Sequence, residues 1–188
     1  DHAAASVLYR RAAARYWKEG GGVPWAVCLT CLGGLCHEMG DLATAESLFA
    51  DAAGVYVGEL ADHPSVATLL NNRSSLLLRQ RKPREALPLI EKALAMELKR
   101  RGEDSPDVIV KRHNLATILR ELGETEKAEA QMELAQAARR RSGATAHPNY
   151  ANGVVVLGSL AADRGHLARA LALFEQASAL FRSVGGGK

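Results

Sequence analysis

Three cysteines and a histidine form the densest cluster of potential metal ligands in this sequence: Cys28, Cys31, Cys36 and His37. A structural zinc ion takes four nitrogen or sulfur ligands at tetrahedral corners, usually with the second pair beyond a loop. Here all four residues fall in one predicted helix, where Cys31 and Cys36 point about 140° apart at about 100° per residue. Because these side chains cannot converge on one ion, we expect reduced, buried thiols that pack as small hydrophobic groups.

The motifs that could support catalysis are incomplete. His37-Glu38 lacks the second histidine of a metalloprotease helix, and Gly20-Gly21-Gly22 lacks the strand and the Lys-Ser/Thr of a phosphate loop. No nucleophile, base and orienting group can be assembled from the chain. The sequence therefore predicts a protein that is not an enzyme and that holds no metal and no cofactor.

A repeat of 42 residues organises the elements that carry these side chains. The dipeptide His63-Pro64 returns as Ser105-Pro106 and again as His147-Pro148. A fixed period of this size indicates stacked supersecondary units. In each unit a small, a large and a small apolar residue follow one another at spacings of four and three, which places them on one face of a helix, here called helix B. These residues are Ala45, Phe49 and Ala52; Ala86, Ile90 and Ala93; Ala128, Met132 and Ala135; and Ala170, Phe174 and Ala177.

An earlier helix in each unit, helix A, carries one small residue twelve positions before the first of these alanines. The four small residues are Gly33, Ser74, Ala116 and Gly158. Gly40, Gly123 and Gly165 follow helix A and fit a left-handed C-terminal stop. The second unit has Arg81 in that turn, where a left-handed backbone would cost about 1 kcal/mol. Ser105, which precedes a proline, is predicted to cap the next helix A.

These patterns predict a single all-α domain of about nine helices, one lone helix followed by four helical pairs. The predicted segments are a lone helix of a partial repeat at 1–22, repeats at 23–62, 63–104, 105–146 and 147–184, and a tail at 185–188. The chain begins at Asp1 without Met, so a removed leader or an upstream domain is compatible with it. We expect a piece of a longer chain or complex.

Charge is unevenly distributed along the repeats. The net charge of the chain is +3, yet residues 23–62 hold six acidic side chains and no Lys or Arg. Residues 63–104 hold nine basic and five acidic side chains. A nucleic-acid binder would keep a positive stripe along its repeats, so the acidic unit disfavours that class. The basic runs at 99–101 and 139–141 end helices B and complement the helix dipole, with a basic recognition patch as the alternative.

The sequence resembles tetratricopeptide repeats, specifically the 42-residue variety of kinesin light chains. The resemblance is carried by HPSVATLLNN and REALPLIEKALAMELKRRGEDSPDV in the second unit and by RHNLATILRELGETEKAEA in the third. It covers nearly the whole chain and implies a right-handed α-α superhelix. In that family helix A lines a concave groove that binds peptides of partner proteins. Arg73, where leucine is usual, and the first and fourth units, which lack paired asparagines, depart from the pattern.

Polar residues on helix A of the second and third units are the candidate peptide contacts. Steps of four residues align several of them away from the packing face, and Asn72 and Asn114 lie 42 residues apart on equivalent positions. An asparagine amide both donates and accepts, so it can hold a peptide backbone. The resemblance implies peptide contact for asparagine at these two positions. The alternative is that the amides tie adjacent repeats together or face water. The full set is Asn71, Asn72, Ser75, Arg79, His113, Asn114, Thr117 and Arg120.

The leading hypothesis is a non-catalytic adaptor that binds an extended peptide of a partner protein, with the basic second unit favouring acidic residues in that peptide. A structural subunit or assembly factor that uses its ends and convex face is the first alternative, and a helical-repeat RNA binder is the second. Three free cysteines favour a reducing compartment, so we expect a cytoplasmic protein. No segment reaches the roughly 20 apolar residues of a membrane span.

Overall fold

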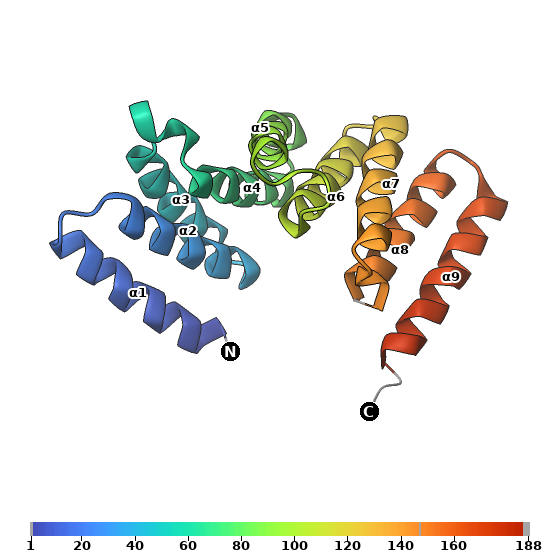
Figure 1. Ribbon diagram of the computed structural model, residues 1–188, viewed down its shortest axis with the longest axis horizontal. Coiled ribbons are helices and arrows are strands. Elements are labelled where there is room, and N and C mark those ends of the chain that lie inside the picture. The colour runs from blue at the N-terminus through green and yellow to red at the C-terminus, as the bar shows by residue number, and fades with distance from the viewer. Residues whose placement is uncertain (1, 147, 186–188) are drawn as a thin grey trace. The chain divides into compact units, whose positions relative to one another are not determined.

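The computed structural model describes residues 2–146 and 148–185 (Figure 1). These residues form nine α-helices and two 3-10 turns and contain no strand, which confirms the predicted all-α fold. The two 3-10 turns are η1 (Gly58–Asp62) and η2 (Ala144–Ala146). The α-helices are α1 (His2–Lys18), α2 (Gly22–Glu38), α3 (Leu42–Val55), α4 (Pro64–Arg79), α5 (Pro83–Arg101), α6 (Pro106–Glu121), α7 (Thr125–Arg141), α8 (Pro148–Asp163) and α9 (Leu167–Gly185).

The helix ends differ from the predicted ones at two places. The sequence assigns the segment 1–22 to the lone helix, whereas α1 ends at Lys18 and α2 begins at Gly22. Gly185 ends α9 and does not begin a tail. His147 and the last three residues of the predicted tail lie outside the described residues.

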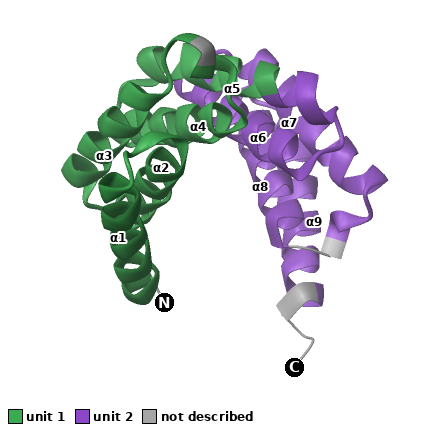
Figure 2. Ribbon diagram, turned by 60° about the vertical axis from the view of Figure 1, so that its left-hand side comes forward, with its two compact units in different colours: residues 1–96 green, residues 97–188 purple. Residues whose placement is uncertain are grey.

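The chain divides into two compact units, residues 1–96 and 97–188 (Figure 2). In the first unit α2 packs on α1 and on α3, and α4 contacts α2 and α3. In the second unit α6 packs on α7, α7 on α8, and α8 on α9. Helix α5 contributes residues to both units.

Close approach of helix A to helix B depends on the small residues that the period predicts. A Cβ atom at Gly33 of α2 would lie 2.6 Å from Cε1 of Phe49 on α3. Gly158 of α8 repeats this arrangement in the second unit, 2.7 Å from Cε1 of Phe174 on α9. All eight predicted alanines are at most 4% exposed, and so are Phe49, Ile90 and Met132, whereas Phe174 is 39% exposed.

The turns within the helical pairs have the expected left-handed residues. Gly40, Gly123 and Gly165 have φ of 86°, 78° and 76°. Arg81 has φ of 61° and is the single non-glycine residue with positive φ in the described part of the chain. The backbone of the second pair therefore keeps the geometry of the others even though its sequence lacks the glycine.

Side-chain caps begin the second and third helices A, by different chemistry. The Ser105 hydroxyl accepts a hydrogen bond from the Asp107 amide at 3.3 Å, as predicted. At the equivalent position His63 uses its ring, since Nδ1 accepts from the Ser65 amide at 3.2 Å. An imidazole nitrogen thus replaces the hydroxyl oxygen as the acceptor for an unpaired N–H group at the start of a helix.

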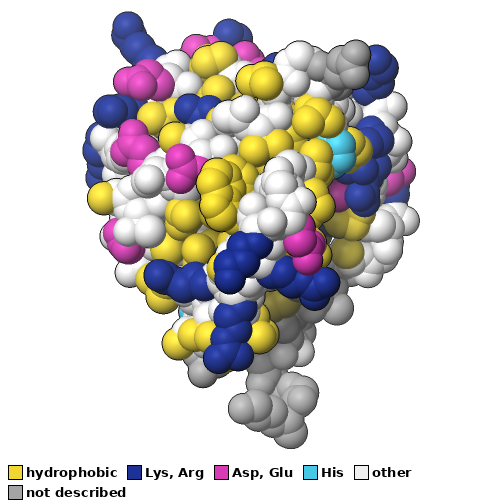
Figure 3. Space-filling model, turned by 90° about the vertical axis from the view of Figure 1, so that its left-hand side faces the viewer, with side chains coloured by type: hydrophobic (Ala, Val, Ile, Leu, Met, Phe, Trp, Pro, Cys, Tyr) yellow, Lys and Arg dark blue, Asp and Glu magenta, His cyan; other side chains and the backbone are white. Residues whose placement is uncertain are grey.

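Acidic and basic side chains are interspersed on the face shown in Figure 3, with hydrophobic groups between them. Several cations of the basic runs are paired within the second unit. Arg100 and Arg101 lie against Glu97, and Arg141 Nε donates to Asp104 at 2.9 Å. Across residues 2–146 and 148–185, no helix combines the length and apolarity that crossing a bilayer requires.

Candidate functional site

In the first unit, three of the predicted contacts form a half-buried polar cluster on α4. The Asn71 amide donates to Asn72 Oδ1 at 3.3 Å, and the Ser75 hydroxyl donates to the Asn71 carbonyl oxygen at 3.1 Å. The Asn72 amide nitrogen lies 3.5 Å from the position that a Cβ would take at Gly34. Asn72 therefore lies within van der Waals reach of α2 of the preceding repeat.

Arg79 extends from the end of α4 to the end of α2. Its Nη1 donates to the carbonyl oxygen of His37 at 2.6 Å. That carbonyl belongs to the last turn of α2, where carbonyl groups lack partners within the helix. In this structure Arg79 thus links two consecutive repeats.

In the second unit, Thr117 and Arg120 have partners on their own helix and on α8. The Thr117 hydroxyl donates to the His113 carbonyl oxygen at 3.1 Å, within α6. Arg120 donates to both carboxylate oxygens of Asp163, at 2.6 and 3.3 Å. The hydrogen bond from Arg120 lowers the pKa of Asp163. Both arginines named as peptide contacts therefore connect helices of neighbouring repeats in the structure.

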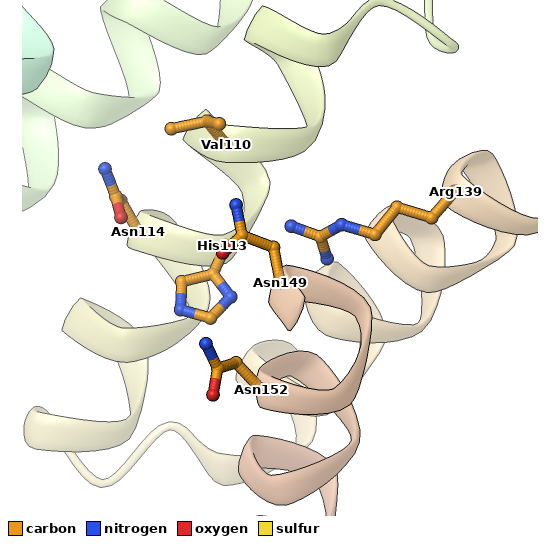
Figure 4. A pocket seen from close by; sticks show the side chains of 6 residues that line it. All are labelled: Val110, His113, Asn114, Arg139, Asn149 and Asn152. Carbon is orange, nitrogen blue, oxygen red and sulfur yellow. The ribbon is translucent and has the colours of Figure 1, made fainter. Parts of the chain in front are cut away.

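His113 and Asn114 line a cavity of about 150 Å³ that lies within the second unit (Figure 4). The cavity lies between α6, α7 and the first turns of α8. Figure 4 shows the Arg139 side chain extending from α7 toward Asn149, and the Asn152 amide beside the His113 ring. Among the described residues, those that line it are Val110, His113, Asn114, Arg139, Asn149 and Asn152.

The electrostatics of this cavity are set by two desolvated nitrogen groups. Burial, followed by the charge of Arg139, lowers the pKa of His113, so its ring is neutral at neutral pH. Its Nδ1 atom is buried without a hydrogen-bond partner in the described part of the chain. Arg139 is only 6% exposed, and burial lowers its pKa.

Gln136 positions Arg139 at this cavity. Arg139 Nη1 donates to Gln136 Oε1 at 2.9 Å, and Gln136 Nε2 donates to the Tyr150 carbonyl oxygen at 2.9 Å. A Cβ at Gly153 would lie 2.5 Å from Gln136 Oε1, so this glycine makes the room that Gln136 occupies. The amide thus joins α7 to α8 and orients the guanidinium beside the cavity.

The structure places the eight predicted residues in two separate groups, four on α4 and four on α6. It brings His113 and Asn114 together with three residues that sequence reasoning missed, Arg139, Asn149 and Asn152. Arg139 belongs to a basic run whose position at a helix end gave a sufficient structural explanation. Asn149 and Asn152 lie three residues apart at the start of α8. That spacing places both on one face of the helix, and it could have identified them from the sequence.

The three cysteines lie in α2, and none of them forms a disulfide bond within the described residues. Cys28 and Cys36 are buried as expected, and burial raises the pKa of both thiols, whereas Cys31 is half-buried. Within residues 2–146 and 148–185, no three His, Cys, Asp or Glu side chains are grouped so that they could hold a metal ion.

The repeat observed here matches a known family along most of the chain. The profile described as "Tetratricopeptide repeat" matches residues 25–98 and 107–183. The chain belongs to the tetratricopeptide repeat family. Repeats of this family form scaffolds for protein–protein interaction, and the fold is typically non-catalytic. Among curated protein sequences there is no significant match.

Several solved structures share the fold at low sequence identity. This chain is similar in structure to BtubC (BKLC) from P. vanneervenii, with TM-score 0.83 and 22% identity over 100% of this chain and 76% of that one. A putative kinesin light chain with nearly identical repeats from Podosopora anserina gives TM-score 0.77 and 18% identity, over 97% of this chain and 87% of that one. YrrB, described as a TPR protein with an unusual peptide-binding site, gives TM-score 0.64 and 16% identity, over 92% of this chain and 78% of that one.

Proposed function

We propose that this protein is a non-catalytic adaptor that binds an extended peptide segment of a partner protein. The observation that carries the proposal is the amide-lined cavity beside α6, in which Asn114, Asn149 and Asn152 surround a space of about 150 Å³. Each amide side chain has donors and an acceptor, so such a set suits a peptide backbone.

The equivalent asparagine of the first unit supports the same function. Asn72 is half-buried on α4 beside Gly34, at the position that Asn114 has on α6. In each unit the polar face of a helix A would hold an extended peptide, with Asn72 in the first unit and Asn114 in the second bonding to a peptide backbone. Arg79 and Arg120 are weaker candidates for peptide contacts. To bind a peptide, they would have to give up their hydrogen bonds to the His37 carbonyl oxygen and to Asp163.

A selection from a displayed library of random 12-residue peptides tests this proposal. Selected peptides should bind the purified chain, and Asn72→Ala combined with Asn114→Ala should weaken binding at least about tenfold, since each lost hydrogen bond costs about 1 kcal/mol. Gln176→Ala is the matched control, because it removes an exposed amide from a helix B. Unchanged affinity of the double variant would contradict the proposal.

An assembly role is the second candidate, favoured by the apolar surface of α9. Leu167 and Leu171 are 70% and 60% exposed, and Phe174 and Phe181 are each 39% exposed. Exposed apolar groups of this number on one helix are typical of an interaction surface. Light scattering at increasing protein concentration tests this candidate; a monomer at every concentration would argue against self-assembly through α9. For either role, the three free thiols support action in a reducing, cytoplasmic compartment.

A further inference from the structure

Arg139 is a buried cation that has no carboxylate partner in the described part of the chain. It is 6% exposed, and within the described residues its guanidinium donates to the neutral amide of Gln136. Burying a charge is unfavourable unless a counter-charge or sufficient hydrogen bonds compensate it. The second unit does compensate its buried carboxylate Glu129, which is bound by Arg164 and Arg169. Arg139 lacks the equivalent compensation.

The uncompensated guanidinium lies at the cavity described above. None of the six lining residues is acidic, and those that accompany Arg139 are three asparagines, His113 and Val110. A volume of about 150 Å³ is several times the share of one water molecule in the liquid, about 30 Å³, so a carboxylate with its methylene group fits. A carboxylate there would accept two parallel hydrogen bonds from arginine and further bonds from the amide groups.

We propose that this cavity is a carboxylate subsite that takes an Asp or Glu side chain of the bound peptide, with Arg139 as its main ligand-binding residue. The proposal rests on the proposed adaptor function and deepens it. Arg139 is on helix B, outside the helix A residues on which the peptide contacts were predicted. With the peptide backbone on the polar face of α6, the acidic side chain of the peptide would therefore point into the cavity between α6 and α8 to reach Arg139.

The first test uses an isolated ligand group, so that it does not depend on a selected peptide. N-acetyl-L-glutamate α-methylamide is titrated into the full chain, and the arginine Nε–Hε signals are followed by NMR. We expect a saturable shift of the Arg139 signal with this probe and none with the glutamine analogue. An equal shift with both probes, or tighter binding of inorganic phosphate than of the glutamate probe, would overturn the carboxylate assignment.

The second test uses peptides from the library selection. Replacing a peptide Glu by Gln should weaken binding about tenfold to the wild-type chain and leave binding to Arg139→Gln unchanged. Arg140→Gln is the matched control, since it removes the same charge from the exposed neighbouring residue. Arg139→Lys keeps the charge without the two-pronged donor, and we expect about a threefold loss. If the Glu-to-Gln effect persists in Arg139→Gln, the subsite is overturned.

The outcomes separate this subsite from the adaptor function as a whole. Peptides that bind through Asn72 and Asn114 but ignore Arg139→Gln would remove the subsite and keep the adaptor. A shift of Arg139 by the glutamate probe, with no peptide selected, would keep the subsite and remove the adaptor. Binding that disappears only when the peptide C-terminus is amidated would replace the side-chain assignment with a terminal carboxylate.

Discussion

Glu97 and Arg139 occupy equivalent positions 42 residues apart, near the ends of α5 and α7. Both are buried, at 1% and 6% exposure. Arg100 donates to the two carboxylate oxygens of Glu97 at 2.8 and 2.9 Å, and Arg101 Nε lies 3.6 Å from Glu97 Oε2. Among the described residues, the Arg139 guanidinium is bonded to the neutral Gln136 amide and to no carboxylate. The repeat period fixes where a side chain is buried, but it does not fix how its charge is compensated.

The two positions illustrate two different roles for a buried charge, one in stabilising the fold and one in binding a ligand. The charge of Glu97 is compensated within the chain, so that carboxylate stabilises the fold. The charge of Arg139 is available to an added ligand, so that guanidinium suits binding. Neutralising a buried ion whose partners are present should cost much more stability than neutralising a buried ion that has no counter-charge.

Neutralising Glu97 should produce the largest change. We expect Glu97→Gln to lower the free energy of unfolding by about 2–3 kcal/mol, because it leaves Arg100 and Arg101 without their carboxylate and removes a negative charge that acts on the buried Lys111. The value lies below that of a fully buried pair because both arginines are more than one third exposed. Urea unfolding followed by circular dichroism measures it.

Arg139→Gln is the counterpart of that substitution. Its stability should stay within about 1 kcal/mol of the wild type, because the change removes a desolvated charge that no carboxylate compensates. A loss as large as that of Glu97→Gln would show that Arg139 is needed for folding, and the contrast between the two positions would disappear.

Two glycines extend the comparison to the packing of the two units. We expect Gly33→Ala to cost about 1–2 kcal/mol, since its Cβ would meet the Phe49 ring, which is 1% exposed and has no space to move. Gly158→Ala should cost less than about 1 kcal/mol, because Phe174 is 39% exposed and can turn toward solvent. Thermal unfolding of both variants tests the order, and equal losses would contradict it.

The turn at Arg81 offers a smaller, stabilising change. Arg81→Gly should raise the free energy of unfolding by about 0.5–1 kcal/mol, because glycine adopts the φ of 61° without a steric penalty. The melting temperature would rise by about 2–3 °C for a chain of this size. Gly123→Ala, in the equivalent turn of the third pair, should shift it downward by a similar amount.

Protonation of two half-buried histidines, His37 and His113, should give the smallest effect near neutral pH. Burial is the main cause that lowers the pKa of both His37 and His113 from 6.5, with Arg79 and Arg139 adding to it. Below pH 6.5 the unfolded chain therefore binds protons that the folded chain does not, so stability is complete above that pH and falls as the pH decreases.

His113→Gln should reduce this acid-side loss while leaving stability at pH 7.5 within about 1 kcal/mol of the wild type. Urea unfolding at pH 7.5 and 5.5 provides the comparison. His166→Gln is the control, because that histidine is exposed at the end of a turn. An unchanged pH dependence in His113→Gln would show that the ring is not buried neutral in solution.

Most of the architecture could be predicted from local patterns. The alanine and large-apolar spacing identified helix B, and Gly40, Gly123 and Gly165 marked the ends of helix A. These predictions succeed because helix periodicity and left-handed stops involve residues close together in the sequence. The candidate cavity was only half found, since Arg139, Asn149 and Asn152 meet His113 and Asn114 through packing between α6, α7 and α8.

The sequence by itself determined the period, the helix ends and the close-packed faces, because each depends on the type and spacing of neighbouring residues. Tertiary structure alone decided which polar groups have partners. It paired Arg79 with a carbonyl of α2 and Arg120 with Asp163, and it left Arg139 buried beside amide side chains. The physical reason is that desolvation and charge compensation depend on atoms tens of residues apart in the chain, which only packing brings together.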